Sequence, residues 1–153
     1  MKNLLKLCKN QNLCGLIPGM KRSEVYELPG ESDDFLAGRK RKTYKRSTIW
    51  VYRKNFQIYF DYNDTVTYIN VFYNITELDD IFSIPPELDY LKDVYKKIPS
   101  SEACIEFLQK NNISFEKKYD IFLEEGCIDI FISPYLHIIY EDNCKSLNSI
   151  RLF

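Results

Sequence analysis

Three short runs rich in aromatic and β-branched residues follow one another in the middle of the chain, at 48–52, 56–62 and 66–73. Such residues favour strands, because their bulky side chains pack well on a pleated surface. Only short polar links, 53–55 and 63–65, separate the runs. Links of this length join antiparallel neighbours, so the sequence predicts a sheet built from hairpins.

A helix precedes strand signals in both halves of the chain. The first is predicted over 21–28 and ends at Pro29, which cannot continue a helix. Another is predicted over 87–97, and a third begins after Ser100, whose hydroxyl is typical of a helix N-cap. Further strand candidates then follow at 114–124, 127–133, 137–141 and 148–153.

The order of a helix and then several antiparallel strands thus occurs twice. We predict an α+β fold of two tandem repeats, each a helix plus an antiparallel sheet, packed together. The predicted parts are a polar N-terminal segment 1–15, a first repeat 16–84, a linking helix 85–98 and a second repeat 99–153. Because each half is too small to bury a core comfortably alone, the two sheets are expected to adjoin or face each other, with helices on one side.

Acid–base chemistry has few candidate groups in this chain. The 21 basic and 22 acidic residues nearly cancel, so no global field marks a nucleic-acid or membrane-surface protein. The single histidine, His137, lies in an apolar stretch at 135–139 and is expected to be a packed strand residue. Carboxylate pairs at turns are expected to be solvated. We therefore expect no catalytic site and a protein that is not an enzyme.

The five cysteines show no metal-binding spacing, because none forms a C-x-x-C pair and no histidine lies at ligand distance in sequence. No metal and no cofactor are expected. Cys104, Cys127 and Cys144 are interpreted as small buried apolar residues of a reduced cytosolic protein. Cys8 and Cys14 could come within disulfide reach, although nothing requires it.

The N-terminal region does not qualify as a secretion leader, because Lys2, Lys6 and Lys9 interrupt every short apolar run. No segment approaches the roughly 18 uncharged apolar residues of a membrane span. The sequence therefore predicts a cytoplasmic protein without a membrane partner.

Aromatic residues make up 15% of the chain, which favours a binding surface, because Tyr, Trp and Phe anchor protein interfaces. Segment 17–30 carries a Gly19-Met20 pair, then Arg22, Val25, Leu28 and Gly30 at fixed offsets. In these residues the chain resembles a group of tandem α-β modules. The group includes the β-lactamase-inhibitor-protein-like domains, the outer-membrane assembly lipoproteins and small bacterial immunity proteins of polymorphic or contact-dependent growth inhibition toxins.

The resemblance is closest to the immunity-type members, because a lipoprotein needs a leader and the inhibitor proteins are secreted. It implies an antitoxin-like protein that neutralises a cognate toxin by stoichiometric binding and occlusion of the toxin's active site. A nuclease is one kind of toxin that the resemblance implies. A nuclease cleft is basic, so carboxylates together with aromatic residues are expected to bind it. The predicted partner-binding residues are Asp33, Asp34, Tyr44, Trp50, Tyr119, Glu124, Glu125 and Asp129.

Two alternatives remain open at this point. The same sheet could serve as a non-catalytic adaptor or assembly module for another cellular protein. The basic run 39–46, with Tyr44 among its lysines and arginines, could instead bind phosphates by charge and stacking. A nucleic-acid partner is disfavoured, because the slightly negative remainder of the chain would repel it. The oligomeric state is left open.

Overall fold

The computed structural model describes residues 2–13, 15–26, 49–52, 56–73, 90–119, 127–141 and 146–153. Within these ranges the helices are α1 (Lys2–Asn10), α2 (Arg22–Tyr26), α3 (Tyr90–Lys97) and α4 (Ser101–Lys110). The strands are β1 (Ile49–Tyr52), β2 (Phe56–Phe60), β3 (Val66–Phe72), β4 (Glu116–Tyr119), β5 (Ile128–Ser133), β6 (Leu136–Glu141) and β7 (Ser146–Leu152).

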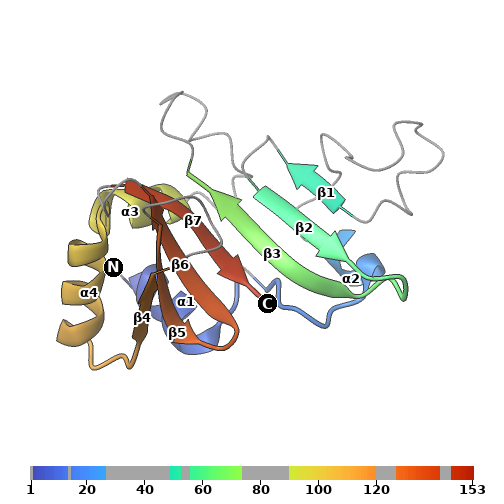
Figure 1. The fold of residues 1–153 in the computed structure, drawn as a ribbon. Helices are drawn as coiled ribbons and strands as arrows, with labels where there is room; N and C mark the ends of the chain where they lie inside the picture. Colours follow the sequence, from blue (N-terminus) through green and yellow to red (C-terminus); the bar gives the residue numbers. More distant parts are fainter. Residues whose placement is uncertain are drawn as a thin grey trace.

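These strands form one antiparallel sheet in the order β1-β2-β3-β7-β6-β5-β4 (Figure 1). Strands β1 to β3 and strands β4 to β7 are each a meander, and the two meanders join where β3 pairs with β7, from Ile69↔Leu152 to Phe72↔Ser149. The predicted α+β class and the hairpins of the first half are confirmed. The expected second sheet is the continuation of the first.

One face of the sheet carries the core. Ile138 at its middle is fully buried and pairs with two equally buried neighbours, Ile130 on β5 and Ile150 on β7. Helices α1, α3 and α4 lie beside the half of the sheet formed by β4 to β7, whereas α2 lies beside β2 and β3 (Figure 1). Side chains at alternate positions point away from the helices, because successive residues of a strand face opposite sides.

Two buried tyrosines form hydrogen bonds to the backbone of α3 and of the residue that follows it. Tyr140 donates its hydroxyl to the Ile98 carbonyl at 2.9 Å, and Tyr73 donates its hydroxyl to the Leu91 carbonyl at 3.0 Å. Both hydroxyls therefore keep a hydrogen bond inside an apolar environment, where an unpaired one would cost about 1–3 kcal/mol.

Helix α1 occupies most of the segment predicted to be polar. Leu4, Leu7 and Cys8 are buried in the core, while Lys6 and Lys9 are exposed. The three buried residues lie three and four positions apart, which places them on one side of a helix. Lys6 and Lys9, which interrupt the apolar runs of this segment, are therefore solvent-facing residues of an amphipathic helix.

Helix α4 begins directly after Ser100, as the sequence predicts. Ser100 is the N-cap, and its Oγ accepts a hydrogen bond from the Ala103 N–H at 3.3 Å. Glu102 in the first turn has a lowered pKa, mainly because its carboxylate accepts a backbone hydrogen bond and secondly because of Ser100. The first turn thus satisfies backbone N–H groups that have no partner within the helix.

The Gly19-Met20 and Arg22 motif docks onto the β2–β3 hairpin. The Gly19 N–H donates to the Val66 carbonyl at 2.7 Å, and the Val66 N–H donates to the Met20 carbonyl at 2.8 Å. Gly19 has a φ of +93°, which only glycine adopts without strain. The Arg22 Nε donates to Asp64 Oδ1 at 2.9 Å, inside the same hairpin. The motif is therefore a structural anchor for the first meander.

Candidate functional site

Only three of the eight predicted partner-binding residues fall within the described ranges. Tyr119, at the end of β4, is 71% exposed and remains available to a partner. The residues outside the described ranges are Asp33, Asp34, Tyr44, Glu124 and Glu125, and the basic run 39–46, Cys14 and Cys144 also lie outside them.

The other two described residues do not lie on an exposed surface. Trp50 is 2% exposed and packs edge-on against the Phe60 ring at 4.8 Å, with the Arg22 guanidinium 5.2 Å from its own ring. Asp129 is 5% exposed and lies beside His137 within the sheet. These two side chains are buried because strand alternation turns Trp50 toward the core and β-sheet neighbours enclose Asp129; their contact with a partner stays a prediction.

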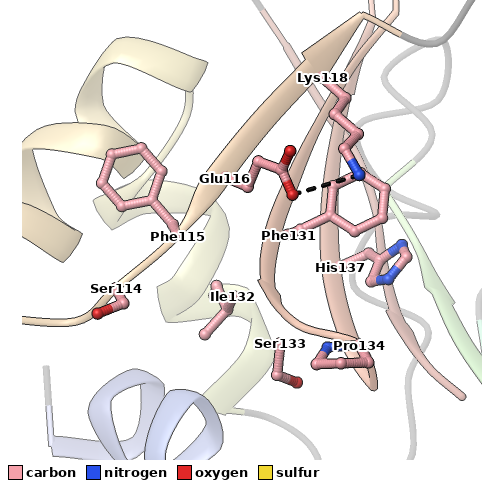
Figure 2. Close-up of a pocket in the computed structure, with 9 residues that line it drawn as sticks. All are labelled: Ser114, Phe115, Glu116, Lys118, Phe131, Ile132, Ser133, Pro134 and His137. Atoms are coloured by element: carbon pink, nitrogen blue, oxygen red, sulfur yellow. Dashed lines mark ion pairs between the residues drawn. The ribbon is translucent and has the colours of Figure 1, made fainter.

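An open pocket of about 540 Å³ lies at the outer edge of the sheet, beside β4 and the end of β5 (Figure 2). We call it the β4–β5 groove; its lining residues are Ser114, Phe115, Glu116, Lys118, Phe131, Ile132, Ser133, Pro134 and His137. The groove forms because β4 is shorter than its neighbour. Glu116 starts β4 opposite Phe131, so Ile132 and Ser133 extend past the β4 ladder.

Both faces of the sheet contribute to the groove. Phe115 and Ile132 are partly buried against the core, whereas Glu116 and Phe131 are register partners and share the opposite face. The groove therefore wraps around the sheet edge and does not lie on a single face.

Lys118 supplies a cation at the mouth of the groove. Its Nζ lies 3.2 Å from Glu116 Oε2 and 4.5 Å from the centre of the Phe131 ring (Figure 2). Both side chains of the ion pair are about half exposed or more, at 52% and 65%. An exposed pair of this kind contributes little stability, about 0–1 kcal/mol, so a partner's carboxylate can replace Glu116 at low cost.

His137 meets the groove from β6. Its Nδ1 lies 3.2 Å from Asp129 Oδ2, which orients the imidazole, and its ring packs 4.0 Å from that of Phe131. Ser133 Oγ accepts hydrogen bonds from the backbone N–H groups of Tyr135 and Leu136, at 3.0 and 3.1 Å. No hydrogen bond among the described residues joins Ser133 to His137, so the geometry does not assemble an activated nucleophile.

A row of aromatic rings runs from the groove across the face of the sheet opposite the core residue Ile138. We call the aromatic row the rings of Phe131, His137, Phe153, Tyr68 and Tyr59, whose successive centroids lie 4.0, 4.6, 5.0 and 4.8 Å apart. Burial raises the pKa of Tyr68 to about 12, and burial also raises that of Tyr59. Nearby Arg151 acts in the opposite direction, because its positive charge favours the phenolate.

Polar atoms lie beside this row. Arg151 on β7 pairs in register with Asn70 on β3 and with His137 on β6. Within the described part of the chain, Arg151 Nε, Asn70 Oδ1, Asp129 Oδ1 and Ser149 Oγ are buried without a hydrogen-bond partner. Buried polar groups in native proteins are usually satisfied, often by ordered water.

Other kinds of site are not formed by the described residues. No three His, Cys, Asp or Glu side chains among them come together to hold a metal ion. None of the described helices is both long and apolar enough to cross a membrane.

No protein-family model, no curated protein and no solved structure matches this chain. The functional argument therefore rests on the sheet, its edge and the groove.

Sequence reasoning had no direct signal for the groove. Phe131, Lys118 and His137 are ordinary strand residues in the sequence, and they become a site only because β4 stops short of the end of β5. The signal that was available is the alternation along 128–133, which places Phe131 on the face opposite Ile130.

Proposed function

We propose that the chain is a cytoplasmic immunity protein that neutralises a cognate bacterial toxin by direct stoichiometric binding, without catalysis or a cofactor. The observation that carries the proposal is a set of exposed large aromatic side chains in and next to the strands. Tyr62 in the β2–β3 turn, Tyr119 at the end of β4, Tyr135 in the β5–β6 turn and Phe153 after β7 are 94%, 71%, 59% and 41% exposed. Exposed tyrosines on a preformed scaffold favour protein binding, because they bring a large contact area at a low cost in conformational entropy.

The mechanism would be occlusion. A protein bound over the toxin's active cleft excludes the substrate, and the strength of the block equals the stability of the complex. Because these aromatic residues lie in a strand, in tight turns or next to a strand end, little ordering would be needed on this side of the complex, which favours tight binding. Charges around the contact would set the association rate and the choice of partner.

The tandem-repeat origin of the two halves is part of the same proposal. It is supported by the topology: α2 precedes the meander β1 to β3, and α4 precedes the meander β4 to β7. The last strands of the two meanders, β3 and β7, pair with each other. Such an arrangement is typical of two like units that complete one another's sheet.

The test is co-expression with the product of the adjacent gene, which the proposal predicts to contain the toxin domain. Growth rescue together with a stable one-to-one complex on size-exclusion chromatography is the expected result. Rescue without a detectable complex would contradict occlusion. If the chain neither rescues growth nor binds the toxin domain, the immunity function is contradicted. That result would favour the adaptor alternative, which predicts a complex with a protein that is not toxic.

A further inference from the structure

We propose that the toxin is bound by strand addition: an extended segment of it, carrying an acidic and an apolar side chain, pairs with the outer edge of β4 and fills the β4–β5 groove. This inference rests on the proposed immunity function and names the part of the partner that is recognised. Three features of the β4 edge carry it.

The first feature is the free backbone of β4. The strand ends the sheet, and its ladder from Glu116↔Phe131 to Tyr119↔Ile128 satisfies only the side that faces β5. Within the described part of the chain no second strand pairs with β4, and all four of its side chains are exposed. An unpaired row of N–H and C=O groups is satisfied by an extended polypeptide, which adds as one more strand.

The second feature is the position of the groove. It begins at Ser114 and Phe115, directly before β4, and continues to Ile132 and Pro134 beyond the β4 ladder (Figure 2). A strand added to β4 and extended past Glu116 would run alongside this opening. Its alternate side chains point to opposite faces of the sheet, so an apolar one can enter between Phe115 and Ile132.

The third feature is charge. Lys117 and Lys118 are neighbours and therefore present one cation on each face of the edge. Lys117 lies 5.3 Å from the ring of the exposed Tyr119, and Lys118 lies above Phe131. Lysines on an edge strand oppose pairing with a second copy of the same strand, because like charges would meet. They favour a strand that brings carboxylates, which is how an edge becomes selective.

The direct test measures backbone amide hydrogen exchange in the free chain and in its purified complex with the neighbouring gene's toxin domain. Strand addition predicts that amides of Glu116–Tyr119 that exchange rapidly in the free chain are slowed at least about tenfold in the complex. The exposed end of α3, at Lys96 and Lys97, serves as the internal reference and should not change. This readout needs no variant.

A matched pair of double variants tests the charge argument. Lys117→Glu with Lys118→Glu should raise the Kd for the toxin domain by about 10-fold to 100-fold, since two attractive contacts become repulsive. Lys96→Glu with Lys97→Glu changes the net charge equally at an exposed site away from β4, and should change Kd by less than about 2-fold.

The outcomes separate the two proposals. A toxin that the wild-type chain neither binds nor neutralises would overturn the immunity function and this inference with it. A tight, neutralising complex without protection at β4, and with equal affinity for both double variants, would overturn strand addition alone. Protection at β4 with selective loss of affinity for the Lys117 and Lys118 variant would support both.

Discussion

At the scale of single residues, burial changes the acidity of two cysteine thiols on the helices. Burial raises the pKa of Cys8 on α1, and that of Cys104 on α4, from 9.0 to about 12. Cys104 adds to the effect on Cys8, because a second negative charge nearby would be unfavourable. Both are free thiols. The interpretation of Cys104 and Cys127 as buried apolar residues is confirmed.

These thiols predict that the protein loses stability in alkali. Below about pH 9 both are protonated whether the chain is folded or unfolded, so they do not alter the free energy of unfolding. As the pH rises above 9.0, the unfolded chain releases protons that the folded chain retains until about 12. The free energy of unfolding should therefore fall, by up to about 1.4 kcal/mol per pH unit for each thiol.

Urea unfolding between about pH 8 and pH 11, followed by Trp50 fluorescence, measures this slope. The double variant Cys8→Ala and Cys104→Ala should show a shallower decline than the wild type. Leu108→Ala is the control, because it opens a cavity in the same core without removing a titratable group, and it should keep the wild-type slope. Equal slopes in all three proteins would contradict the assignment.

Residue identity alone did not determine which predicted site residues are exposed. Tyr119 could be predicted because a tyrosine at the end of a charged, exposed strand has no core to enter. Trp50 and Asp129 could not, because their burial depends on strand pairing. Trp50 pairs with the core residue Ile58, and Asp129 lies between neighbouring strands beside His137. The register between two strands cannot be predicted from the residue at a single position.

At the scale of elements, the parts of the fold that could be predicted are those specified by residues close together in sequence. The hairpins of β1 to β3 and the capped start of α4 could be predicted, because turn residues and N-caps act on neighbours in sequence. Helix α1 was missed, since three lysines hide the spacing of Leu4, Leu7 and Cys8. The groove also belongs to this scale, because it results from the unequal lengths of β4 and β5.

Helix α1 is predicted to be a necessary part of the core. Leu7 is 1% exposed, so Leu7→Ala should lower the free energy of unfolding by about 2–5 kcal/mol, through lost burial and the cavity left behind. Lys6→Ala, on the exposed side of the same helix, should change it by less than about 0.5 kcal/mol. Urea denaturation of both variants measures the difference, and similar midpoints for the two would show that α1 contributes no packing energy.

At the scale of the whole molecule, the β3–β7 ladder makes the two meanders one sheet. Its four register pairs run from Ile69↔Leu152 to Phe72↔Ser149 and lie at the centre of the strand order. Buried residues from both halves belong to one continuous hydrophobic cluster. The pairing of such distant strands has no local sequence pattern, so the choice between adjoining and facing sheets required the structure.

A continuous sheet predicts that the two halves unfold together. Ile138 is fully buried on β6, and Ile138→Ala should destabilise the protein by about 2–5 kcal/mol. The only tryptophan, Trp50, lies in the other half. Its fluorescence transition in urea should shift by the same amount as the far-ultraviolet circular dichroism transition. Lys110→Ala should shift neither, and a Trp50 transition that stays in place in Ile138→Ala would show independent halves.

The strand order also bears on how the chain matures during synthesis. β7 is the middle strand of the sheet, yet it is the last of the strands in sequence. While the ribosome is still adding residues, β3 and β6 each lack the neighbour that will separate them. The seam between the halves closes only after 146–152 has left the exit tunnel, so the edges of β3 and β6 stay open in the nascent chain until β7 emerges.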